Sequence, residues 1–93
     1  MPIRNDEEII LDKILNNQIT KRIENLISIR NISAYKLMKD LELNKPTFYK
    51  CLNGESYWSV GNLIKIAHYF NVSLDWLIDG EERTRSPNEY ENR

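Results

Sequence analysis

The sequence predicts an all-α protein, and three observations carry this prediction. The chain has 93 residues, which is the length of a single small domain. It contains only three glycines and three prolines, the residues that most often interrupt helices. Its apolar residues recur at spacings of three and four instead of alternating, as in amphipathic helices. No uninterrupted apolar run exceeds three residues, so no membrane-spanning segment is expected.

The segment before residue 20 predicts a short amphipathic helix over residues 6–16. Acids fill its first turn, where the helix dipole favours negative charge. Its apolar side chains are Ile9, Ile10, Ile14 and Leu15. Asn16 and Asn17 then predict a weak break in the helix. Residues 1–19 are therefore expected to form a helical extension outside the main domain.

Two helices are expected next. Thr20 is a candidate N-cap for a helix that ends at Arg30, and Asn31 suits a left-handed position after it. Ser33 is the candidate N-cap of a second helix that ends near residue 41. The side chains expected to face the core are Ile23, Leu26, Ile27, Leu37, Met38 and Leu41.

The following helix is expected over residues 44–52. Asn44 is its candidate N-cap, and Pro46 lies in its first turn, where a missing amide costs nothing. Gly54 marks its end, and its core-facing side chains are Phe48, Cys51 and Leu52. Together with the preceding helix it forms a helix-turn-helix pattern over about residues 33–52.

Two more helices complete the domain, which is expected over residues 20–80. Ser59 and Ser73 are their candidate N-caps, and Asn71 and Gly80 are expected to end them. The core-facing side chains of the first are expected to be Val60, Leu63, Ile64 and Ala67. Residues 81–93 hold seven charges and one aromatic, so they are expected to form a mobile charged tail.

The run from Arg22 to Gly80 resembles the DNA-binding domain of the phage repressor and Cro family, the XRE-type helix-turn-helix regulators. The matching pieces are Arg30-Asn31-Ile32-Ser33, Leu37, Leu41, Asn53-Gly54, Leu63-Ile64-Lys65-Ile66-Ala67 and Asn71-Val72-Ser73-Leu74-Asp75-Trp76-Leu77. The resemblance implies a five-helix repressor-like domain, here with an extra short N-terminal helix. It also implies a sequence-specific DNA-binding regulator of transcription, acting as a repressor.

The resemblance places helix 44–52 in the major groove of duplex DNA. The residues that it implies for base contacts are Lys45, Pro46, Thr47, Tyr49 and Lys50. Lysine can donate to guanine O6 and N7, and proline can pack on a thymine methyl group. The residues implied for phosphate contacts are Ser33, Lys36, Asn44 and Asn53, with Lys39 a weaker candidate. The expected partners are an operator duplex and a second copy of the chain, with half-site centres about 34 Å apart.

Three positions depart from the family pattern. Ala34 stands where the family usually has a glutamine that braces the recognition helix and touches phosphate. Met38 replaces the small alanine at the closest approach of the two helices. Glu42 replaces the turn glycine, so a left-handed backbone there would cost about 1 kcal/mol. These changes affect the docking angle and the DNA sequence that is read.

The formal net charge of −1 hides an uneven distribution. Residues 1–17 carry −2 and residues 81–93 carry −1, whereas the segment 30–54 carries +3. The basic residues of that segment are Arg30, Lys36, Lys39, Lys45 and Lys50. A basic segment between acidic ends is expected to bind non-specific DNA weakly, with a shallow salt dependence.

Several conspicuous residues have plain structural explanations. Cys51 is the only cysteine, which excludes an internal disulfide and favours a cytoplasmic location; it is expected to be a small buried residue. His68 is expected at the surface or the core boundary. Tyr57 and Trp58 either contact the DNA backbone or, as expected, close over the core. Trp76 is expected in the core or in a dimer interface.

The sequence also bears on two classes of function other than DNA binding. An enzyme is not expected, because the chain has no glycine-rich phosphate loop, no metal-ligand spacing and no paired nucleophile and histidine; no cofactor is expected either. The alternative is a protein-interaction module of the same fold, such as an antitoxin or adaptor with a regulatory protein partner. Ile10, Ile14 and Leu15 could pack on the domain, which is the plain structural explanation, or they could instead form part of a dimer seam or of a partner site.

Overall fold

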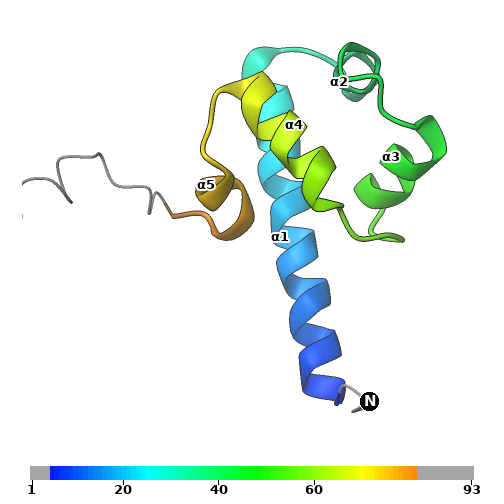
Figure 1. Ribbon diagram of the computed structural model, residues 1–93, viewed down its shortest axis with the longest axis vertical. Helices are drawn as coiled ribbons and strands as arrows, with labels where there is room; N and C mark the ends of the chain where they lie inside the picture. The colour runs from blue at the N-terminus through cyan, green and yellow to red at the C-terminus, as the bar shows by residue number, and fades with distance from the viewer. Residues whose placement is uncertain (1–4, 82–93) are drawn as a thin grey trace, which may run out of the picture.

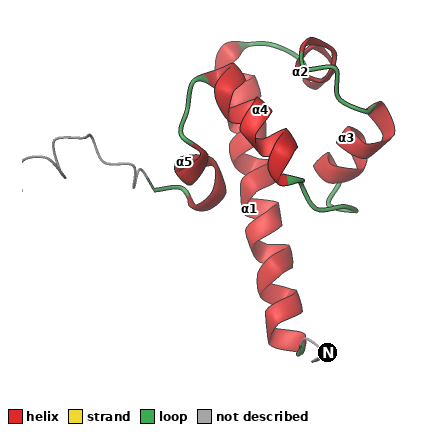
Figure 2. Ribbon diagram, in the orientation of Figure 1, coloured by secondary structure: helices red, strands yellow, loops and turns green. Residues whose placement is uncertain are grey.

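The structure is a computed structural model that describes residues 5–81, and within that range it consists of helices without strands (Figures 1 and 2). The helices are α1 (Asp6–Arg30), α2 (Ala34–Asp40), α3 (Lys45–Leu52), α4 (Val60–Phe70) and α5 (Leu74–Asp79). The all-α, five-helix class is therefore confirmed. Apart from residue 81, the predicted tail lies outside the described residues. No helix in the described range is long and apolar enough to cross a membrane.

The helix ends follow the local sequence. Each N-cap side chain accepts a hydrogen bond from a backbone N–H of the first turn, and Ser33, Asn44, Ser59 and Ser73 do so as predicted. Asn31, Asn71 and Gly80 adopt the left-handed conformation after α1, α4 and α5. These caps satisfy amide and carbonyl groups that have no partner within the helix.

Helix α1 is continuous, so the predicted break at Asn16 and Asn17 is wrong. Asn16 is buried; its side-chain nitrogen donates to the Ser56 carbonyl at 3.3 Å, and its Oδ1 accepts the Trp58 amide at 3.1 Å. An asparagine disrupts a helix when its side chain competes for nearby backbone groups. Here the loop between α3 and α4 supplies the partners instead.

Thr20 is not a cap either, because it lies inside α1 and is buried. Its hydroxyl donates to the Asn16 carbonyl at 3.1 Å and accepts the indole N–H of Trp58 at 2.8 Å. Trp58 is buried, which confirms that it closes over the core, whereas Tyr57 is 52% exposed. The loop between α3 and α4 is thus fastened to α1 by three hydrogen bonds of Asn16 and Thr20.

One hydrophobic core joins all five helices. Its buried side chains are Ile19, Ile23, Leu37, Met38, Leu43, Phe48, Cys51, Trp58, Leu63, Ile66, Ala67, Phe70 and Leu77. The assignment of Val60 and Ile64 to the core is wrong, since they are 66% and 40% exposed. Helix α4 keeps Leu63 and Ala67 in the core as predicted, but it buries Ile66 and the larger Phe70 in place of Val60 and Ile64.

The first half of α1 extends beyond the domain (Figure 1). Ile10 is 56% exposed and Ile14 is 46% exposed, and neighbouring apolar side chains are similarly open to solvent. The possibility that this stripe packs on the domain of its own chain is therefore contradicted. Trp76, in contrast, is partly buried and packs against the core.

Candidate nucleic-acid interface

A tight turn through Glu42 orients α3 relative to α2. The backbone of Glu42 is left-handed, with φ of 54°, which costs a residue other than glycine about 1 kcal/mol. Two backbone hydrogen bonds hold the turn: Glu42 donates to the Lys39 carbonyl at 3.1 Å, and Leu43 donates to the Met38 carbonyl at 3.0 Å. Leu43 is also buried, so the turn is anchored to the core.

The inner face of α3 is fixed in the core. Phe48 and Cys51 are each 1% exposed, and the Phe48 ring makes edge-to-face contacts with Tyr49 and Trp58 at centroid distances of 5.3 and 5.8 Å. Burial raises the pKa of the Cys51 thiol, and its Sγ donates to the Tyr57 carbonyl at 3.5 Å. Cys51 is therefore a structural residue with a neutral thiol.

The outer face of α3 carries the residues predicted for base contacts. Lys45, Pro46, Thr47 and Lys50 are exposed, whereas Tyr49 is half-buried beside Phe48. At 3.6 residues per turn, Pro46 and Lys50 lie nearly opposite the buried side of the helix. The structure thus brings these side chains together on one exposed surface, with Tyr49 at its edge.

Three of the residues predicted for phosphate contacts lie at the ends of α2 and α3. The Ser33 hydroxyl oxygen accepts the Lys36 amide at 3.0 Å, and the Asn44 Oδ1 accepts the Thr47 amide at 2.9 Å. Asn53 follows α3 and is exposed. Both caps use only an acceptor oxygen, so the hydroxyl hydrogen of Ser33 and the side-chain N–H groups of Asn44 are not consumed by capping.

Lys36 has a partner within the protein. Its ammonium lies 3.1 Å from the Asp40 carboxylate, which also accepts the Tyr69 hydroxyl at 2.6 Å. The Tyr69 hydrogen bond, followed by that of Lys36, lowers the pKa of Asp40, and the hydrogen bond to Asp40 raises the pKa of Lys36. The i, i+4 spacing of Lys36 and Asp40 was visible in the sequence, but the contribution of Tyr69 depends on how α2 packs near α4.

The other basic residues of the segment 30–54 differ in availability. The Arg30 guanidinium donates to the Phe70 carbonyl at 3.1 Å and lies 5.3 Å from the centre of the Phe70 ring. Lys39 lies 5.9 Å from the Tyr35 ring centre but remains exposed, as Lys45 and Lys50 do. The pair of Lys36 and Asp40 adds nothing to the net charge of +3 in this segment, so the charge that is open to a ligand is carried mainly by the exposed Lys39, Lys45 and Lys50.

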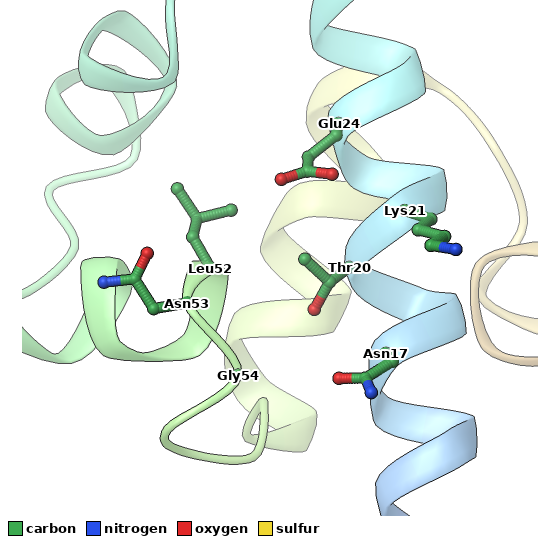
Figure 3. Close-up of a pocket in the computed structure, with 7 residues that line it drawn as sticks. All are labelled: Asn17, Thr20, Lys21, Glu24, Leu52, Asn53 and Gly54. Carbon is green, nitrogen blue, oxygen red and sulfur yellow. The ribbon is translucent and has the colours of Figure 1, made fainter.

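A cleft of about 260 Å³ separates α1 from the end of α3 (Figure 3). Its lining residues are Asn17, Thr20, Lys21, Glu24, Leu52, Asn53 and Gly54. Figure 3 shows Thr20 and Glu24 projecting from α1 toward the side on which Leu52 ends α3. The cleft identifies which side of α1 faces the end of α3.

Comparisons with known proteins agree with this arrangement. A search of curated proteins and a search of solved structures each found no match to the chain. A family model described as the Cro/C1-type HTH DNA-binding domain matches residues 22–79, more than half of the chain. The match covers residues 22–30 at the end of α1 and all of α2 to α5. The chain therefore belongs to the Cro/C1-type helix-turn-helix family of DNA-binding domains.

Proposed function

We propose that this protein is a sequence-specific transcription regulator that represses by occupying an operator in the cytoplasm. The observation that supports the proposal most directly is the division of α3 into two faces. One face holds Phe48 and Cys51 in the core, and the other presents exposed Lys45, Pro46 and Lys50. A helix about 10–12 Å wide fits the major groove, which is about 12 Å wide.

Each exposed side chain of α3 suits a particular contact. Lys45 and Lys50 would donate to guanine O6 and N7, and Tyr49 would offer its hydroxyl or ring edge. Pro46 and Thr47 would contact thymine methyl groups. The helix-end residues Ser33, Asn44 and Asn53 would donate to phosphates, and Lys36 would join them by exchanging Asp40 for a phosphate oxygen.

The functional form is proposed to be a homodimer on a palindromic operator. One recognition helix reaches only a few base pairs, so two copies are needed for a site that is distinct in a genome. The two half-site centres would lie about 34 Å apart, one turn of DNA. Because the available positive charge is small, specificity would depend on dimer formation more than on attraction to phosphate.

Selection of bound duplexes from a random DNA pool at fixed salt tests the proposal. We expect enrichment of an inverted repeat whose half-sites are one turn apart. A folded protein that enriches no sequence would contradict the proposal. It would favour the second candidate, a protein-interaction module such as an antitoxin or adaptor, which is supported by the exposed apolar side chains in the first half of α1.

A further inference from the structure

We infer that the homodimer forms through an antiparallel seam between the projecting halves of two α1 helices, an inference that rests on the proposed function. The surface concerned is called the α1 patch. It consists of Ile10, Leu11, Ile14 and Leu15, which are 56%, 53%, 46% and 39% exposed. The occupant of the α1 patch is a second copy of the same chain.

The described part of its own domain leaves the α1 patch uncovered. Its residues follow an i, i+1, i+4, i+5 pattern, so they form one continuous strip on the helix. Successive residues turn by about 100°, so the middle of this strip lies about 130° around the helix from the side of α1 that buries Ile19 and Ile23. The part of α1 that carries the α1 patch also extends past the other helices (Figure 1). No other element of the described residues covers these side chains, and we assign their burial to a second molecule.

The side of α1 on which the α1 patch lies suits a dimer whose two α3 helices contact the same DNA duplex. In an antiparallel pair, the two-fold axis is perpendicular to both helices and to the line that joins them. Asn17, Thr20, Lys21 and Glu24 mark the side of α1 that faces α3, about a quarter turn from the α1 patch. The two-fold axis therefore points toward the side on which α3 lies, and both recognition helices face the same side of the dimer.

The position of the α1 patch along the helix also suits the proposed operator. Thr20 and Glu24 line the cleft beside the end of α3, and they lie about 11 and 17 Å beyond the midpoint of the α1 patch at a rise of 1.5 Å per residue. A two-fold axis through that midpoint doubles these offsets to about 22 and 34 Å. The upper value equals one turn of DNA, about 34 Å.

Charge favours the antiparallel arrangement over a parallel one. A parallel pair would bring together two first turns that each contain Asp6, Glu7 and Glu8. An antiparallel pair centred on the α1 patch places Glu7 opposite the partner's Gln18, within one turn of the partner's Lys21, and opposes the helix dipoles. Gln18, Lys21 and Asn25, which continue the α1 patch along the same side of α1, are exposed.

The seam is small, and this predicts how the dimer behaves. Four half-exposed side chains per copy fall short of the roughly 800 Å² per partner that stable interfaces bury. The dimer is therefore expected to dissociate on dilution and to be favoured by DNA that carries two half-sites, because binding one copy raises the effective concentration of the other.

Two matched variants test the seam. Ile14→Asp places a charge in the α1 patch, and Ile9→Asp places the same charge on the same projecting segment. Ile9 is 43% exposed, close to the value for Ile14, but lies about 140° around the helix. Circular dichroism checks that both variants keep their helix content, and analytical ultracentrifugation measures their mass as concentration is raised.

We expect wild type and Ile9→Asp to approach twice 11.1 kDa with rising concentration, while Ile14→Asp stays a folded monomer. Ile14→Asp should also lose roughly a hundredfold in affinity for a two-half-site duplex and keep its affinity for a single half-site. Equal dimerisation of the two variants would overturn the seam. Wild-type protein that binds the two half-sites as independent monomers would also overturn the seam. The α1 patch would then be a site for a different protein.

Cysteine cross-linking tests the direction of the two helices. A mixture of Glu7→Cys and Gln18→Cys chains should form a mixed disulfide, whereas Glu7→Cys alone should not cross-link, because its two copies would lie about 16 Å apart. Cross-linking of Glu7→Cys with itself would contradict the antiparallel arrangement. The native Cys51 is buried, so it does not compete. The cross-links form without DNA, so they test the seam alone. Failure of wild-type protein to enrich any duplex would count against the proposed function and not against the seam.

Discussion

The two halves of α1 differ in whether their side chains are buried. Between residues 6 and 15 the large apolar side chains are exposed. Between residues 16 and 30 even polar Asn16 and Thr20 are buried, because the loop between α3 and α4 supplies their hydrogen-bond partners. The same helix thus shows that position beside other elements, and not residue type alone, decides burial. In helix α3 the buried and exposed side chains lie on two faces of one helix: Phe48 and Cys51 are buried, and Lys45 and Lys50 are exposed.

The largest expected effect distinguishes isoleucines in the two halves of α1. Ile23 is 0% exposed, so Ile23→Ala should lower the free energy of unfolding by about 3 kcal/mol through lost burial and a cavity. Ile14→Ala should change it by less than about 0.5 kcal/mol in dilute protein. Guanidinium denaturation measures both values, and equal losses would show that the first half of α1 is packed after all.

Adjacent asparagines give the next test. Asn16→Ala leaves the buried Trp58 amide and the Ser56 carbonyl without their partner, so it should cost about 1–3 kcal/mol of unfolding free energy. Asn17 is exposed, and alanine is the better helix former by up to about 0.7 kcal/mol. Asn17→Ala should therefore be neutral or slightly stabilising. Thermal denaturation of both variants compares them directly, and a stable Asn16→Ala would mean that the loop does not depend on this contact.

On α3 the exposed face should affect binding without affecting stability. Lys50→Ala should weaken operator binding by about 1–3 kcal/mol and leave the melting temperature unchanged. Lys65→Ala is the matched control, because Lys65 is exposed on α4 and its loss removes the same charge. Titrations at one salt concentration measure both affinities. Retained affinity in Lys50→Ala, or an equal loss in Lys65→Ala, would exclude a base contact by Lys50.

The smallest effect concerns the pairing of Lys36. Asp40→Asn should release the Lys36 ammonium and steepen the salt dependence of DNA binding by about one unit. Lys36→Ala should then weaken binding more in the Asp40→Asn background than in wild type, which a double-mutant cycle measures. Because the folded-state pKa of Asp40 lies below its usual value, the stabilisation it gives is present at neutral pH and is lost as pH falls into the acid range. Additive effects in the cycle would show that Asp40 does not restrain Lys36.

Local features of the fold could be predicted from the sequence, and features that depend on distant contacts could not. Caps such as Ser33 and Asn44 depend on a few neighbouring residues. The continuity of α1 at Asn16 depends on Trp58, which is 42 residues away. Which apolar side chains α4 buries likewise depends on how that helix rotates against its neighbours.

The candidate site divides in the same way. The exposed lysines of α3 followed from helical periodicity and from the family pattern around them. The hydrogen bond between Tyr69 and Asp40 joins residues 29 apart, and it becomes visible only once α2 and α4 are placed. Sequence patterns therefore identified which side chains face outward, but not which of them already have a partner.

The hydrogen bonds between α1 and the loop after α3 affect which spacings of two DNA half-sites the proposed dimer would accept. Helix α1 runs without interruption from Asp6 to Arg30, and Asn16 and Thr20 join it to the loop that follows α3. The proposed seam is therefore joined to α3 of each copy without a flexible linker. Two copies paired in this way would hold their α3 helices at a fixed distance from each other. Operators with one base pair added or removed at the centre would be rejected, whereas flexibly tethered domains would tolerate them.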